Sequence, residues 1–298
     1  MPESPVHPKS IVLGCTAMLV STVFFASMHA CVRYLSEDIH PFEIAFFRNL
    51  FGVMFLAPFI MRNGARLLRT RHFNWHLLRA GINVFAMLIF FYALSITPLA
   101  TVQALSFTAP LFTTVLAVFL LGERVRFRRW AAVLAGFVGV LIILRPGAQP
   151  IEFGAILVLL SAAIWALTMI IIKRLSNTDS PLTITAYVTL FLTVMSLPPA
   201  LWVWSWPDGW HWFWFVVAGF TGTMGQLCVA KAFAYADATL VLPFDFAKII
   251  WGALLGFLFF GEYVSAYTWI GAVVIFGGAT YVAYRERQIE KLKATSTG

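Results

Sequence analysis

The sequence has few charged residues. Asp, Glu, Lys and Arg make up 11% of its 298 residues, whereas about 25% is typical of soluble domains. Hydrophobic residues make up 60%, and the mean hydropathy is +0.84. This small number of charged residues cannot cover the surface of a soluble globule. Lipid must therefore cover the surface of this protein. The composition therefore excludes a soluble domain, a disordered chain and a collagen-like chain, and it predicts a polytopic membrane protein.

Cysteine and the common catalytic motifs are also scarce. Cys15, Cys31 and Cys228 lie inside apolar stretches without a CxxC pattern, which excludes a disulfide-rich scaffold and predicts neither a disulfide nor a metal site. The sequence contains no GxxxxGK[ST] loop and no HExxH motif, and no Ser/His/Asp set can be proposed from spacing. We therefore expect no cofactor, no metal and no ATP-driven motor in this chain.

Ten apolar stretches have the approximate length of a membrane-spanning helix, although the fifth is short. They cover residues 11–35, 42–61, 77–96, 101–121, 130–144, 153–173, 182–204, 211–233, 239–260 and 266–284.

The positions of the basic residues set the expected orientation. The net charge of +8 would suggest nucleic acid in a soluble protein, but the basic residues lie mainly between the apolar stretches. On one side we count Lys9, Arg62, Arg66, Arg69, Arg71, Arg124, Arg126, Arg128, Arg129, Lys173, Arg174, Arg285, Arg287, Lys291 and Lys293. The other side has little more than Arg33 and Arg145. By the positive-inside rule, both termini are cytoplasmic, and no nucleic-acid partner is expected.

Tryptophans bracket the connection between the seventh and eighth stretches, on the expected outer side: Trp202, Trp204, Trp206, Trp210, Trp212 and Trp214. Because tryptophan is enriched at membrane interfaces, we favour an interfacial anchor over a binding site for this cluster.

The two halves of the chain resemble each other at an offset of 139 to 140 residues. Pro41 matches Pro181, and the pair Gly122-Glu123 matches the pair Gly261-Glu262. We therefore predict two repeats, 11–145 and 151–285, followed by a cytoplasmic tail, 286–298. Five spans per repeat is an odd number, so the copies insert with opposite orientations. Inverted repeats around a central substrate site are typical of secondary transporters.

Two segments carry a family resemblance: PLATVQALSFTAPLFTTVLAVFLLGERV (98–125) and ADATLVLPFDFAKIIWGALLGFLFFGEYV (236–264). They resemble the ends of the two halves of the EamA family, in the drug/metabolite transporter (DMT) superfamily. The resemblance covers 11–285 and implies ten transmembrane helices as two inverted five-helix repeats around a central cavity. The stretch HPFEIAFFRNLFG (40–52) is similar to the branch that includes S-adenosylmethionine carriers. Ile249 departs from the pattern, because Pro110 stands at the equivalent position of the first half.

These features together predict a secondary active transporter of small organic metabolites in a bacterial-type inner membrane, as a monomer or homodimer. The resemblance favours export of amino acids, including aromatic ones, by alternating access. The alternative is uptake of S-adenosylmethionine, riboflavin or a similar nucleoside-like metabolite. An intramembrane enzyme or lipid-processing protein would need clustered catalytic carboxylates or a metal set, which the sequence does not show.

Asp245 and Lys248 are the clearest candidates for a site. They lie three residues apart on one face of the ninth stretch, close enough to pair. A charge at bilayer depth costs on the order of 3 kcal/mol, so such residues usually face the interior or a watery cavity. We favour a role in transport, with Asp245 binding a coupling proton or a substrate ammonium, over an ion pair that only fixes helix packing.

Arg48 and Asn49 lie roughly 9 Å into the second stretch from its outer end, at 1.5 Å per residue. The guanidinium of Arg48 suits a carboxylate or phosphate, but a structural pair with Glu43 is an equal alternative. His29 lies at a similar depth in the first stretch, where its titration near neutral pH suits a proton-coupled step. A structural histidine is the alternative for His29.

Six further polar or aromatic residues are weaker candidates, because each of them could serve interhelical packing alone: Asn83, Tyr92, Gln103, Trp165, Tyr187 and Gln226. Arg79 and Lys231 lie near cytoplasmic ends, so we expect their side chains to extend to the interface. Gly252 and Gly256 form a GxxxG motif, for which we favour intramolecular helix packing over a dimer contact.

Overall fold

The computed structural model describes residues 8–63, 70–109, 111–113, 115–116, 127–146, 152–175, 178–235, 244–245 and 247–277. Its helices are α1 (Pro8–Leu35), α2 (Pro41–Asn63), α3 (Phe73–Ile96), α4 (Leu99–Ser106), α6 (Phe127–Leu144), α7 (Phe153–Leu175), α8 (Pro181–Trp202), α9 (Gly209–Tyr235) and α11 (Ala247–Phe260). A further helix covers Ala266–Gly277. The predicted tail 286–298 and the pair Gly122-Glu123 lie outside the described residues.

The helices correspond to the predicted spans. Within the described residues, five helices are long and apolar enough to cross a membrane: Val12–Leu35, Pro41–Arg62, Phe73–Ile96, Leu182–Trp202 and Gly209–Val229. Shorter apolar helices cover Leu99–Thr113, Leu134–Leu144, Phe153–Thr168, Ala247–Phe260 and Ala266–Gly277. The predicted all-α membrane fold is confirmed.

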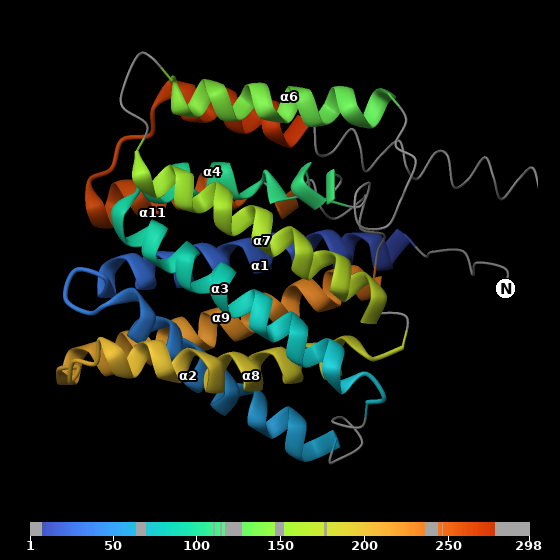
Figure 1. Ribbon diagram of the computed structural model, residues 1–298, viewed down its shortest axis with the longest axis vertical. Helices are drawn as coiled ribbons and strands as arrows, with labels where there is room; N and C mark the ends of the chain where they lie inside the picture. Colours follow the sequence, from blue (N-terminus) through green and yellow to red (C-terminus); the bar gives the residue numbers. More distant parts are fainter. Residues whose placement is uncertain are drawn as a thin grey trace, which may run out of the picture.

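Equivalent helices of the two halves run in opposite directions. Figure 1 shows α1 running from right to left and α7 from left to right, and α3 and α9 are reversed in the same way. The packing follows this relationship, because α1 lies against α9 in the same way that α3 lies against α7. The α2 helix packs against its own counterpart, α8, and α4 against α11. The two halves therefore share one interior.

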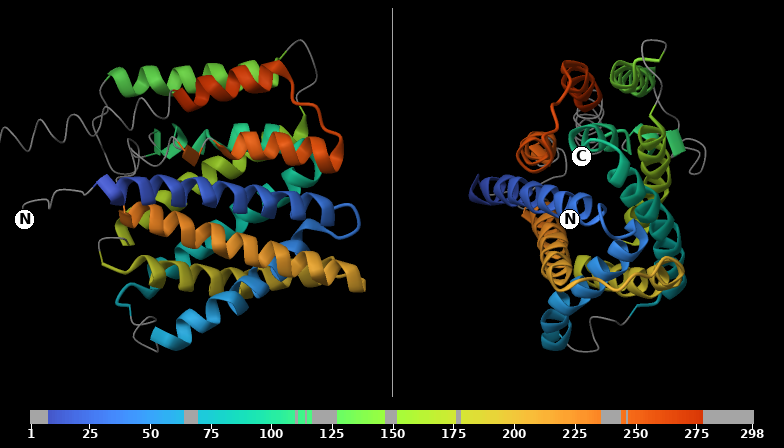
Figure 2. Two further views of the ribbon diagram at one scale, coloured as in Figure 1. Left: turned by 180° about the vertical axis from the view of Figure 1, so that it is seen from behind. Right: turned by 90° about the vertical axis from the view of Figure 1, so that its left-hand side faces the viewer.

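The elements are arranged with α4 and α11 between two groups of helices. Figures 1 and 2 show α6 and the helix Ala266–Gly277 together at one edge of the molecule, beyond α4 and α11. One core of buried apolar side chains extends through all of these helices, from Leu35 on α1 to Ile275 on the last one. Charged side chains in this interior therefore stand among apolar neighbours.

The tryptophans between α8 and α9 divide into two groups. Trp202, Trp206 and Trp210 are exposed, as an interfacial anchor requires. Trp204 and Trp212 instead pack on Phe47 of α2, at ring-centroid distances of 5.2 and 5.0 Å. Part of the predicted anchor thus belongs to the protein core.

Candidate functional site

Asp245 and Lys248 form the ion pair that their spacing predicts. Lys248 Nζ lies 2.5 Å from Asp245 Oδ1, where the N-terminal end of α11 faces α1. Lys248 Nζ also lies 5.0 Å from the centre of the Phe25 ring on α1, a cation–π contact. The lysine is therefore held between a carboxylate and an aromatic face.

Arg48 occupies a space that a glycine leaves open. Its side chain reaches from α2 to α9, where a Cβ on Gly222 would lie 2.8 Å from Arg48 Nη2. Arg48 Nη1 donates a hydrogen bond of 2.7 Å to the side-chain oxygen of Asn49. The Nε atom of Arg48 is buried and has no hydrogen-bond partner among the described residues. The guanidinium therefore keeps a donor for another group.

Glu43 does not pair with Arg48, contrary to one alternative drawn from the sequence. Glu43 Oε2 accepts hydrogen bonds from the backbone N–H and the hydroxyl of Ser205, each at 3.0 Å. Residues five apart on a helix point in different directions, because each residue turns the helix by about 100°. The helical geometry thus separates these two charges.

His29 joins the two charged sites. Its ring lies 5.2 Å from that of Phe90 on α3 and 6.5 Å from that of Phe25, one turn earlier on α1. Lys248 and Arg48 are both close enough to act electrostatically on His29. Its Nδ1 atom is buried and has no hydrogen-bond partner among the described residues. We call these neighbouring side chains the central cluster: Phe25, His29, Arg48, Asn49, Phe90, Asp245 and Lys248.

Gln103 lies at the contact between α4 and α11. A Cβ on Gly252 would collide with its side-chain amide, whose oxygen and nitrogen are buried without partners among the described residues. Gly252 stands one helical turn from Lys248. The Gly252 position of the GxxxG motif therefore serves packing within the chain, and it places Gln103 one helical turn from Lys248 along α11.

The other candidates are dispersed. Tyr187 stacks on His76, with ring centroids 4.6 Å apart, and belongs to a separate cluster with Asp179. Tyr92 is partly exposed, and its ring lies 6.3 Å from His40 in the connection between α1 and α2. Asn83 is buried on α3, and Trp165 and Gln226 are half-buried on α7 and α9.

Arg79 corrects one prediction. Its side chain is buried and donates a hydrogen bond of 3.0 Å from Nη1 to the backbone oxygen of Ile184 on α8. It does not extend to the interface, because it is buried against α8 and donates to a backbone carbonyl of that helix. Lys231 is exposed, as expected.

An ion pair at the opposite end of α11 was not predicted as a site. Arg33 Nη2 lies 3.1 Å from Glu262 Oε1, and Arg33 Nη1 donates to the backbone oxygen of Leu94 at 3.0 Å. Glu262 Oε2 accepts a hydrogen bond of 2.8 Å from the backbone N–H of Leu99, the first residue of α4. We call these four residues the outer tie, because the distribution of basic residues predicts that this end of the bundle faces outward. The repeated Gly-Glu pair and the position of Arg33 on the side poor in basic residues were the available signals.

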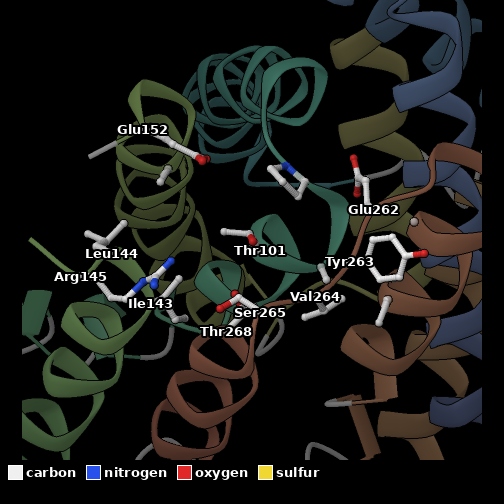
Figure 3. A pocket seen from close by; sticks show the side chains of 16 residues that line it. Thr101, Ile143, Leu144, Arg145, Glu152, Glu262, Tyr263, Val264, Ser265 and Thr268 are labelled. Carbon is white, nitrogen blue, oxygen red and sulfur yellow. The ribbon is translucent and has the colours of Figure 1, made fainter. Parts of the chain in front are cut away.

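A pocket of about 150 Å³ opens beside the outer tie. Figure 3 shows Glu262 and Tyr263 on one side of it and Glu152 and Arg145 on another, with Thr101 of α4 between them. Among the described residues, no group of three or more His, Cys, Asp and Glu side chains is placed to hold a metal ion.

Comparison with known proteins identifies the family. The chain matches the EamA-like transporter family over residues 12–145 and 152–284. It is 31% identical to an S-adenosylmethionine uptake transporter of Rickettsia felis, over 97% of this chain and 98% of that protein. It is 34% identical to a riboflavin transporter of Vibrio cholerae, over 94% of this chain and 95% of that protein.

More distant matches agree with this result. The chain is 26% identical to a pseudopaline exporter of Pseudomonas aeruginosa, over 88% of this chain and 93% of that protein. A crystal structure at 20% identity has a TM-score of 0.63 and covers 95% of this chain and 99% of its own, so it shows the same fold. The chain therefore belongs to the EamA-like transporter family and is an integral membrane transporter of small molecules.

Proposed function

We propose that this protein is an uptake carrier for S-adenosylmethionine, riboflavin or a similar metabolite that joins a heteroaromatic ring to a polar chain. The observation that carries this proposal is the match, over nearly the whole chain, to proteins that take up S-adenosylmethionine or transport riboflavin. These relatives favour the uptake alternative over the export of amino acids.

The central cluster supports a substrate of this kind. Phe25 and Phe90 supply ring faces near Arg48 and Lys248, which supply donors and charge. Aromatic side chains bind flat heterocycles by stacking, and a guanidinium binds a pair of acceptor oxygens through two parallel hydrogen bonds. We propose this cluster as the binding site, with Gln103 beside it. The repeats 11–145 and 151–285 would move around the site to give alternating access.

The charges of the cluster discriminate between the two substrates. Arg48 and Lys248 contribute two positive charges, whereas the one carboxylate that contacts either of them among the described residues, Asp245, is already paired with Lys248. A sulfonium cation would be repelled by this excess of positive charge. Riboflavin is uncharged, and its ring carbonyls can accept hydrogen bonds from Arg48. Within the proposed class we therefore favour riboflavin.

Transport by the purified protein in liposomes tests the proposal. Vesicles preloaded with unlabelled riboflavin should accumulate labelled riboflavin by saturable counterflow, and S-adenosylmethionine should exchange more slowly. Exchange of aromatic amino acids without exchange of either metabolite would overturn the proposal. Repeating the assay with an imposed pH gradient tests the predicted coupling proton.

A further inference from the structure

We infer that the outer tie holds the outer mouth of the helix bundle closed, and that Arg33 and Glu262 must separate before substrate passes this end. This step concerns access to the site, and it holds whichever metabolite the central cluster binds.

The outer tie joins the ends of four helices. Arg33 lies near the end of α1 and Leu94 near the end of α3, while Leu99 begins α4 and Glu262 follows α11. The contacts between Arg33 and Glu262 join residues 229 positions apart, so they link the first half of the chain to the second. A movement that opens the bundle between these helices must break them.

The backbone conformation after α11 positions the carboxylate of Glu262. Gly261 has a φ of +64°, a conformation that glycine adopts without strain. The backbone N–H of Glu262 then donates to the oxygen of Gly256 at 3.0 Å, which turns the chain back over the end of the helix. A Cβ on Gly256 would lie 3.0 Å from Glu262 Oε2. The second Gly-Glu pair, Gly261-Glu262, thus directs a carboxylate onto the first turn of α4.

The charge of Glu262 suits the two groups that it contacts. The first N–H groups of a helix have no partner inside it and carry partial positive charge, so α4 and Arg33 both stabilise the carboxylate. Both charged side chains of the pair are largely buried. Loss of either one therefore leaves the other without its main partner.

The pocket beside the outer tie provides space for a movement. It is lined by Ala100 and Thr101 of α4 and by Gly252 and Gly256 of α11, on the side facing α6 and the last helix. The outer ends of α4 and α11 can therefore shift toward this space once Glu262 releases Leu99.

Reactivity of Cys31 can report opening. Cys31 is buried on α1, two residues before Arg33, so a water-soluble thiol reagent reaches it only when this end opens. The experiment uses full-length protein in vesicles with Cys15→Ser and Cys228→Ser, and a membrane-impermeant methanethiosulfonate added to each side in turn. Glu262→Gln and Arg33→Gln should each raise the rate of modification about tenfold from one side, as expected for a lost charge-assisted hydrogen bond.

Two matched variants control for general loosening. Asp38→Asn removes the charge of the carboxylate that contacts His211 at the same end of the bundle, and Glu152→Gln removes a carboxylate from the pocket wall opposite Glu262. Neither should change the rate. The exchange Arg33→Glu with Glu262→Arg should restore part of the protection. Unchanged rates in both Arg33→Gln and Glu262→Gln, or an equal rise in Asp38→Asn, would overturn the inference. Because no substrate is used, the result does not depend on the proposed function.

Discussion

His76 and Asp179 are 103 residues apart in the sequence, and His76 Nε2 lies 2.9 Å from Asp179 Oδ2. The pair joins the start of α3 to the connection between α7 and α8. A second pair, His211 and Asp38, joins the start of α9 to the connection between α1 and α2, at 3.2 Å. The two pairs join equivalent elements of the two inverted halves, although the two histidines do not occupy the same repeat position. The fold therefore places one histidine–aspartate contact at each end of the bundle.

Burial makes the two contacts unequal in strength. The side chains of His76 and Asp179 are 0% and 8% exposed, whereas those of His211 and Asp38 are 14% and 69% exposed. Asp179→Ala should cost about 3 kcal/mol, because it leaves buried partners unpaired. Asp38→Ala should cost less than about 1 kcal/mol. Thermal unfolding in detergent measures the difference, and equal losses would contradict the assignment.

Gly222→Ala tests whether Arg48 holds substrate. The added methyl group would displace the guanidinium, since its carbon would lie 2.8 Å from Nη2. The KM of uptake should rise about tenfold, the usual size of a lost hydrogen bond to a charged group. Gly81→Ala on α3 is the matched control, because nothing lies within 4 Å of its added carbon. An unchanged KM in Gly222→Ala would remove Arg48 from the site.

Neutralising Asp245 or Lys248, at the N-terminal end of α11, tests whether the ion pair serves transport or only helix packing. Asp245→Asn and Lys248→Gln should each reduce the rate of uptake at least about tenfold, because each leaves an unpaired charge in an apolar interior. Lys231→Gln, at an exposed lysine on α9, should transport normally. The amount of folded protein in the membrane is measured in parallel. Full transport by both charge variants would show that the pair is structural.

His40 should make the stability of the protein depend on pH. It lies between α1 and α2, where Nδ1 accepts a hydrogen bond from the backbone N–H of Phe42 at 3.2 Å. Burial lowers its pKa below the ordinary value of 6.5. The unfolded chain therefore takes up a proton at a higher pH than the folded protein does. Stability contributed by neutral His40 is complete above pH 6.5 and decreases on acidification toward the lowered pKa.

His40→Asn isolates this effect, because its side-chain oxygen can still accept the bond from Phe42. The unfolding temperature of the wild type should fall more than that of the variant between about pH 7.5 and pH 5. Parallel curves for the two proteins would show that His40 does not contribute.

Sequence predicted side-chain contacts where the partners are close along the chain. Asp245 and Lys248 could be paired from their spacing, and Arg48 could be placed at depth in α2. The sequence could not show that His29 lies within electrostatic range of both Arg48 and Lys248. Nor could it show that Tyr187 stacks on His76 in a different cluster. Arg79 was misjudged for the same reason, since its partner is a carbonyl 105 residues away.

The sequence by itself determined the membrane environment, the helical spans and the inverted repeat. The membrane environment and the spans follow from local hydropathy, and the repeat follows from residues that recur at a fixed offset. Neither requires knowing which residues are in contact in the folded protein. Only the tertiary structure decided which charges meet. Gly222 admits Arg48, Gly256 accommodates Glu262, and Arg33 reaches across 229 positions to the other half. Such contacts are set by how closely helices approach one another, and that distance is a property of the packed bundle.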